Sequence, residues 1–324
     1  MKLDEISRPI ESELARFREE FKEAMTSEVG LIDKVAGYVL QQKGKQARPI
    51  LVLLSANIAG GINDSTYRAA ALVELLHTAT LIHDDVVDTA DMRRGLPAIN
   101  ALWKNKVAVL MGDYLLSRGL LLALKHRDHR FLEIISDAVK RMSEGELLQI
   151  EKTRSLDIDE ATYFKIISDK TASLISTSCE IGAASASSDT TIQQNLRACG
   201  EAIGIAFQIQ DDILDYLGKS SKTGKPVGGD IKEKKITLPL IYALENSDAQ
   251  KRKEIIALLK SDKKRTLFSK EIIHFATEHG GIEYAEQTAK KFVQKALDAL
   301  SSFPASPSKA ALELFINFAV ARQT

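Results

Sequence analysis

One acidic pattern occurs twice in this sequence of 324 residues. The aspartates of its two copies, DDVVD and DDILD, are Asp84, Asp85, Asp88, Asp211, Asp212 and Asp215. Both copies lie in apolar sequence with helical periodicity, so the first and last aspartates of each share a helix face, where like charges repel. Mg²⁺ prefers such oxygen ligands and typically binds through one or two carboxylates plus substrate phosphates. The repetition favours two metal-binding clusters that hold one diphosphate, although a single cluster would fit a solvated acidic face equally well.

Two arginines follow the first acidic cluster within a short turn. Arg93 and Arg94 lie in the sequence DMRRGLP at 91–97. A planar guanidinium can make paired, charge-assisted hydrogen bonds with a diphosphate. An arginine pair that only neutralised the aspartates would explain the charge but not the Gly-Pro turn. We therefore expect the turn to bring both guanidinium groups close to the proposed metals.

A second basic motif, GKQARP at 44–49, lies farther upstream. Its proline is well placed to begin the apolar helix that follows, which puts Lys45 and Arg48 near a helix N-terminus, where anions are favoured. His77 precedes Asp84 by two helical turns and so points to the same face. A lone histidine of this kind is more often a hydrogen-bonded core residue than a ligand, and only its neighbours favour a functional role.

Long helices must position these residues. Only seven prolines occur, and none lies between 98 and 225. Apolar residues recur at helical spacing in the segments 65–88, 102–124, 131–150, 161–184, 192–217 and 238–259. An Asn-Asp-Ser sequence before the first of them is a candidate helix cap. Strand-like alternation is nearly absent, so we expect an all-α fold with helices packed around a central core.

The segment 218–235 differs in composition, with four glycines, six lysines and few apolar residues. It predicts a mobile basic loop. A functional lid and a solvated linker between helical domains are equally compatible with it.

Composition excludes several classes of protein. Lys+Arg and Asp+Glu are both 44, so no long-range field would attract nucleic acid or anionic lipid. Cys179 and Cys199 lack metal-site spacing and lie in apolar surroundings, which favours reduced core thiols. The charged N-terminus predicts no signal peptide, and we expect no apolar stretch of the roughly 20 residues that span a bilayer. A cytoplasmic protein fits these features.

These motifs, in this order and over nearly the whole chain, resemble the trans-isoprenyl diphosphate synthase family, in particular its medium- and long-chain members such as octaprenyl diphosphate synthases. Further matches are Lys170-Thr171, Phe207-Gln208 and Gly224-Lys225, followed by Asp230 and Lys235. The resemblance implies one isoprenoid-synthase-type helical domain over 1–324 with a central active-site cavity. It also implies a prenyltransferase that adds isopentenyl diphosphate to an allylic diphosphate and releases pyrophosphate.

The resemblance assigns roles to individual residues. Mg²⁺, about three ions per site with substrate bound, would be held by Asp84, Asp88, Asp211 and Asp215. Arg93, Lys170, Lys225 and Lys235 would contact the allylic diphosphate. Lys45, Arg48, His77 and Arg94 would hold isopentenyl diphosphate. Thr171 and Gln208 would lie beside the ionising carbon, and homodimerisation is expected, with peripheral membrane contact for product release.

Product length depends on the helix before the first acidic cluster. In the family, bulky aromatics five and four positions before its first aspartate resemble a floor that stops growth, and here Ala79 and Thr80 are both small. The resemblance therefore implies a product of about seven or eight isoprene units, with the floor formed by larger side chains deeper in the bundle.

Three alternatives remain at this point. A shorter-chain synthase producing farnesyl or geranylgeranyl diphosphate would share the motifs. A terpene cyclase would not need the second DDxxD or the pair Lys45 and Arg48. A non-catalytic subunit of a heteromeric synthase should have eroded motifs, and none is eroded here.

Overall fold

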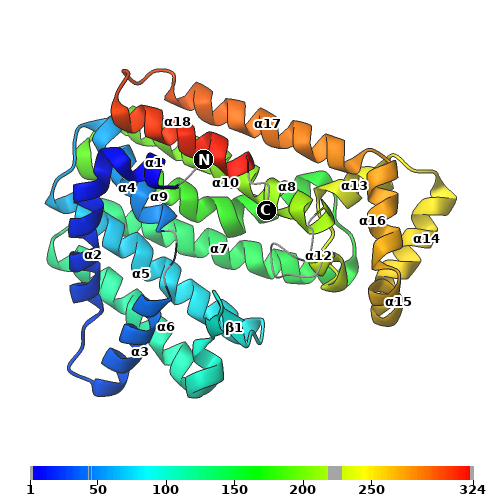
Figure 1. The fold of residues 1–324 in the computed structure, drawn as a ribbon, viewed down its shortest axis with the longest axis horizontal. Coiled ribbons are helices and arrows are strands. Elements are labelled where there is room, and N and C mark those ends of the chain that lie inside the picture. The colour runs from blue at the N-terminus through cyan, green and yellow to red at the C-terminus, as the bar shows by residue number, and fades with distance from the viewer. Residues whose placement is uncertain (1–2, 43, 45, 218–227, 322–324) are drawn as a thin grey trace. The chain divides into compact units, whose positions relative to one another are not determined.

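The computed structural model describes residues 3–42, 44, 46–217 and 228–321. Within these residues the fold is helical apart from a two-stranded ribbon, as the sequence predicts (Figure 1). The chain forms two compact units, one comprising 1–137, 177–197 and 300–314, the other 138–176, 198–299 and 315–324. The division falls inside helices α7 (His129–Ser155), α9 (Ser173–Ala186), α10 (Thr190–Leu217) and α18 (Pro307–Val320), and before the last residue of α17 (Gly281–Leu300).

The first unit is built around helix α5 (Asp64–Val87), which packs along α6 (Ile99–Lys125) and against α4 (Ala47–Ala59) (Figure 1). Asn63 caps α5 through a reciprocal box with Thr66, so the predicted cap is confirmed. Buried leucines and alanines of α4 and α5 form the core. The remaining elements are α1 (Leu3–Ser7), a 3₁₀ turn (Arg8–Ile10), α2 (Glu11–Met25), α3 (Gly30–Gln41), β1 (Met92–Arg93) and β2 (Leu96–Pro97).

The second unit packs α13 (Leu238–Glu245) against α8 (Glu160–Ile167) and α16 (Ser269–Glu278) over an isoleucine-rich core. A π-helical turn, Ser168–Ala172, joins α8 to α9. The other elements are α12 (Gly229–Lys232), α14 (Ala249–Lys260), α15 (Asp262–Leu267) and α17 (Gly281–Leu300).

Three sequence expectations need correction. The segment predicted as one helix over 161–184 is interrupted by the π-turn. The helix predicted over 238–259 is two helices. The first ends at Glu245 with Asn246 as its C-cap, and Asp248 caps α14 by accepting a hydrogen bond from the N–H of Lys251 at 2.8 Å. The predicted loop over 218–235 contains the short helix α12, while 218–227 lie outside the described residues.

Helix α6 also departs from expectation. By length and composition it could cross a membrane, and only 33% of its most apolar window is buried. The expectation that no apolar stretch reaches this length is therefore wrong, although one such helix is weak evidence for a span. Both cysteines are buried thiols that form no disulfide, as predicted.

Candidate active site

The first unit contains a pocket of about 600 Å³ lined by both basic and acidic side chains. Its charged and histidine lining residues are Arg18, Glu19, Lys22, Glu74, His77, Asp85, Arg93 and Arg94. Three predicted substrate ligands, His77, Arg93 and Arg94, thus share one cavity, and Arg48 is bonded to His77 beside it. Lys45 lies outside the described residues.

Arg48 stands in the first turn of α4, which begins after Gln46 adopts a left-handed φ of 49°. Its Nη1 lies 2.9 Å from Nε2 of His77 on α5. Burial lowers the pKa of Arg48 to about 10, which leaves the guanidinium charged at neutral pH. Burial, and then the positive charges of Arg48 and the hairpin arginines, hold the pKa of His77 well below 6.5.

Glu74 is an acidic group in this pocket that the sequence did not reveal. It lies one helical turn before His77 and its Oε2 is buried without a hydrogen-bond partner. The Nε of Arg48 is likewise buried and unpaired. Burial raises the pKa of Glu74, whereas the charges of Arg48 and Arg94 act in the opposite direction. The spacing of three residues before His77 is the one signal that could have indicated it.

The hairpin β1–β2 positions the two predicted arginines. Its central residues, Arg94 and Gly95, have φ of 53° and 78°, the left-handed backbone that a tight two-residue hairpin requires. Arg93 donates from Nε to Oδ1 of Asp85 at 2.8 Å, and Arg94 donates from Nη1 to the carbonyl of Gln42 at 2.9 Å. The predicted turn is confirmed.

The three aspartates of the first cluster have different environments. Asp85 is 4% exposed and forms the ion pair with Arg93, whereas Asp84 is half-buried and Asp88 is exposed at the end of α5. The sequence analysis assigned metal binding to Asp84 and Asp88 and gave no role to Asp85, the buried member of the cluster. Its burial could have been predicted, because Asp85 follows the apolar residue Ile82 by three positions and therefore shares its helix face.

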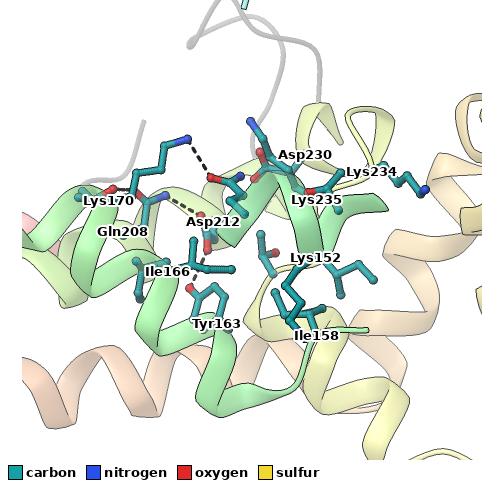
Figure 2. Close-up of a pocket in the computed structure, with 16 residues that line it drawn as sticks. Lys152, Ile158, Tyr163, Ile166, Lys170, Gln208, Asp212, Asp230, Lys234 and Lys235 are labelled. Carbon is teal, nitrogen blue, oxygen red and sulfur yellow. Dashed lines mark hydrogen bonds between the residues drawn. The ribbon is translucent and has the colours of Figure 1, made fainter. Parts of the chain in front are cut away.

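The second unit contains a pocket of about 230 Å³, shown in Figure 2. Four predicted residues line it: Lys170, Thr171, Gln208 and Lys235. Polar lining residues that the sequence analysis did not assign are Gln149, Lys152, Tyr163, Asp212, Asp230 and Lys234. Lys225 lies outside the described residues.

A chain of hydrogen bonds runs along this pocket. Thr171 donates from Oγ1 to Oε1 of Gln208 at 3.0 Å, and Gln208 donates from Nε2 to Oδ1 of Asp212 at 2.8 Å. The buried hydroxyl of Tyr163 donates to Oδ2 of Asp212 at 2.6 Å (Figure 2). The chain holds both oxygens of Asp212 and turns the Gln208 carbonyl oxygen towards Thr171.

Lys170 lies at the rim of the same pocket and has two partners on α7. Its Nζ donates to Oε1 of Gln149 at 2.8 Å and pairs with Oε2 of Glu146 at 2.5 Å. The side chain of Lys170 is 35% exposed. Lys170 can therefore exchange these partners for an anion entering from solvent.

Asp212 carries a carboxyl group whose pKa is strongly raised. Burial, with the nearby charge of Asp230, raises its pKa to about 8, against the hydrogen bonds from Tyr163 and Gln208. A cation beside this carboxylate would reverse the effect. With Asp212 and Asp230 beside four lysines on its lining, the pocket is suited to a metal ion that arrives with an anionic group.

Asp215 was expected to bind Mg²⁺, but here its carboxylate accepts hydrogen bonds from the backbone. Its Oδ1 accepts the N–H of Gly229 and its Oδ2 the N–H of Asp230, both at 3.0 Å, so this carboxylate anchors the start of α12. Asp211 is half-buried. The contact with Asp215 places Asp230 on the pocket lining. In the sequence, only the family resemblance had pointed to Asp230.

The described residues include no group of three or more His, Cys, Asp or Glu side chains that could hold an ion. Mg²⁺ that arrives with a diphosphate needs only one or two carboxylates, because phosphates and water complete its shell. Asp212 and Asp230 both line this pocket, and such a pair of carboxylates supplies the oxygen donors that an ion arriving with a diphosphate needs.

The two residues expected to set product length, Ala79 and Thr80, lie on α5. Ala79 is 2% exposed and Thr80 is half-buried. Neither belongs to the lining of the two pockets described above. Their role as a cavity wall stays a prediction.

Comparison with known proteins gives consistent matches over the full chain. A family model described as polyprenyl synthetase matches residues 29–275. The octaprenyl diphosphate synthase of Haemophilus influenzae is 35% identical over 96% of this chain and 94% of its own length. The heptaprenyl diphosphate synthase component 2 of Geobacillus stearothermophilus is 34% identical over 96% of both chains. A polyprenyl synthase structure from Caulobacter crescentus, complexed with calcium and isoprenyl diphosphate, has a TM-score of 0.89 and 35% identity, covering 100% of this chain and 98% of its own.

Proposed function

Because the chain belongs to the polyprenyl synthetase family and is therefore a prenyltransferase, we propose that it is a Mg²⁺-dependent all-trans polyprenyl diphosphate synthase. It condenses isopentenyl diphosphate onto an allylic diphosphate and makes a medium to long product of about seven or eight isoprene units. The name of the Haemophilus relative supports this length. The observation that carries the proposal is the hydrogen-bonded chain from Thr171 to Asp212 beside Lys170.

The side chains of the second unit would serve the allylic substrate. Lys170 and Lys235 would contact its diphosphate, and Mg²⁺ held beside that group by the aspartates of the pocket would supply positive charge that favours departure of pyrophosphate. The oxygens of Thr171 and Gln208 lie beside the carbon from which pyrophosphate leaves and stabilise the positive charge that develops there. Gln208 is suited to this because its amide nitrogen is bonded to Asp212, which leaves its carbonyl oxygen on the side of Thr171.

The pocket of the first unit, which contains the hairpin arginines, would bind isopentenyl diphosphate. Arg48, Arg94 and Lys45 hold its phosphates, and neutral His77 fixes the Arg48 guanidinium. The double bond of this substrate attacks the allylic cation, and a proton is then lost to the released pyrophosphate. No histidine or glutamate of the motifs is expected to take that proton.

We further propose that the protein is a homodimer in the cytoplasm and touches a membrane during product release. The exposed leucines of α6, Leu110 and Leu121 at 58% and Leu124 at 50%, support a second copy as the partner of this helix. Analytical ultracentrifugation of the wild type and of Leu121→Glu tests the dimer: the variant should shift towards monomer. Sedimentation with vesicles tests membrane contact.

The activity is tested with purified protein, Mg²⁺, isopentenyl diphosphate, and farnesyl or geranylgeranyl diphosphate. Products are sized by chromatography after phosphatase treatment, and a ladder ending near the proposed length is expected. Product formation by this chain alone would exclude a non-catalytic subunit, and a cyclic hydrocarbon would identify a cyclase. The proposal fails if no chain elongation occurs, and its metal dependence fails if turnover survives chelation by EDTA.

A further inference from the structure

The π-turn Ser168–Ala172 separates the side chains of three consecutive residues. Its widened geometry is defined by the N–H of Ser173, which bonds to the carbonyl of Ser168 five residues earlier. Lys170 and Thr171 line the pocket of the second unit, whereas Asp169 is 8% exposed and is not part of the lining. The turn thus presents two predicted catalytic residues on one side and a buried carboxylate on the other.

Arg141 of α7 binds the buried side of this turn. Its Nε donates to Oδ1 of Asp169 at 2.8 Å, and its Nη2 donates to Oγ of Ser168 at 2.9 Å and to Oε1 of Glu201 on α10 at 2.8 Å. Ser168 in turn donates to the same oxygen of Glu201 at 2.6 Å. One guanidinium therefore ties α7 and α10 to the first two residues of the turn.

The second oxygen of Asp169 is also occupied, since Lys165 donates from Nζ to Oδ2 at 3.0 Å. Burial disfavours the charged carboxylate, but the hydrogen bonds from Arg141 and Lys165 outweigh it and hold the pKa of Asp169 below its usual value. Arg141 is only 18% exposed, so its ion pairs are poorly screened by solvent.

Two glycines bring the neighbouring helices into direct contact with the turn. A Cβ added to Gly145 on α7 would lie 2.8 Å from the backbone nitrogen of Lys170, and one added to Gly204 on α10 would lie 2.5 Å from Cα of Ala172. Arg141 precedes Gly145 by four residues, and Glu201 precedes Gly204 by three, so each charged residue shares a helix face with its glycine. Close backbone approach and the ion pairs act at the same place.

We propose that Arg141, with Asp169 and Glu201, is a positioning device that maintains the π-turn so that Lys170 and Thr171 face the allylic diphosphate. The inference rests on the proposed function. π-Turns are rare and poorly stabilised by their own hydrogen bonds, and without Arg141 the segment relaxes towards a regular helix. Each residue then rotates relative to its neighbours, and Lys170 moves away from Glu146 and Gln149.

The test compares Arg141→Met with a matched control, Arg197→Met. Arg197 of α10 pairs with Asp137 of α7 and Glu180 of α9, so it also joins α7 to α10, and neither of these two partners lies in the π-turn. Arg141→Met should raise the KM for the allylic diphosphate by about tenfold or more, and lower kcat, because small displacements of catalytic groups are costly. The KM for isopentenyl diphosphate should stay within about twofold, and Arg197→Met should change neither KM.

Hydrogen exchange gives a readout that does not depend on activity. Amides of 168–176 should exchange about tenfold faster in Arg141→Met than in the wild type, and no faster in Arg197→Met. Arg141→Lys keeps the positive charge but loses the planar guanidinium, so its exchange rates and allylic KM should lie between those of the wild type and Arg141→Met. If Arg141→Met does not fold, Arg141→Lys takes its place in the test. The proposal is overturned if the allylic KM and the exchange of 168–176 are unchanged, or if both variants behave alike. Absence of product from the wild type would instead refute the proposed function, and the exchange comparison would still decide the role of Arg141.

Discussion

Arg48 and His77 form a buried contact in which Nη1 and Nε2 are 2.9 Å apart. A guanidinium can only donate, so Nε2 of His77 must be the acceptor and the imidazole must be neutral. The low pKa of His77 agrees with this assignment. The contact links the first turn of α4 to α5 and fixes the cation that would bind isopentenyl diphosphate.

This contact predicts a loss of stability in acid. The folded state holds the pKa of His77 well below 6.5, whereas the unfolded chain protonates it near 6.5. The unfolded state therefore binds more protons below that pH, and stability falls as pH decreases, by at most about 1.4 kcal/mol per pH unit. His77→Gln, which can accept the same hydrogen bond without titrating, should reduce this slope between pH 6.5 and the lower folded pKa. Denaturant unfolding at several pH values measures it, and an unchanged slope would refute the assignment.

Gly44 is predicted to be a specificity position because of its contact with Arg94. A Cβ at this position would collide with the Arg94 guanidinium, which is the mobile end of a long side chain. Gly44→Ala should therefore displace Arg94 without unfolding the protein. The KM for isopentenyl diphosphate should rise roughly tenfold, the effect of losing one charge-assisted hydrogen bond.

Gly37→Ala is the matched control for this substitution, since a Cβ there has open space around it. It should leave both KM values unchanged. Equal effects of the two substitutions would contradict a specific role for Gly44, as would an unchanged KM in Gly44→Ala.

In protein freed of divalent ions, Asp212 predicts that stability falls as pH rises, the opposite of the effect expected from His77. Its pKa is raised from 3.8 to about 8 by burial and by Asp230, so the folded state binds the extra proton between these values. The contribution is complete below pH 3.8 and is lost as pH rises to about 8, again by at most about 1.4 kcal/mol per unit. Asp212→Asn should be less sensitive over this range. Thermal melting with EDTA at each pH is the measurement, and parallel curves for both proteins would exclude the raised pKa.

Ala79→Phe tests the expected wall of the product cavity. If the side chain faces the growing chain, the phenyl group should shorten the product while the melting temperature changes little. If Ala79 instead packs in the core, overpacking should cost about 1–3 kcal/mol. Ala79→Ser, similar in size, should keep the product length of the wild type. An unchanged product distribution in Ala79→Phe would refute the wall.

Local sequence was sufficient to predict the helices, the cap at Asn63, the arginine turn and both acidic motifs. Helical periodicity and capping depend on residues a few positions apart, so they can be predicted without knowledge of the fold. Local sequence could not predict contacts between residues from distant segments. Tyr163 reaches Asp212 across 49 residues, and Arg141 reaches Glu201 across 60. Tertiary packing alone selected Asp85 and Asp212 as the buried aspartates of their motifs and opened a π-turn within the helix predicted over 161–184, because the cost of a buried charge is decided by its three-dimensional neighbours.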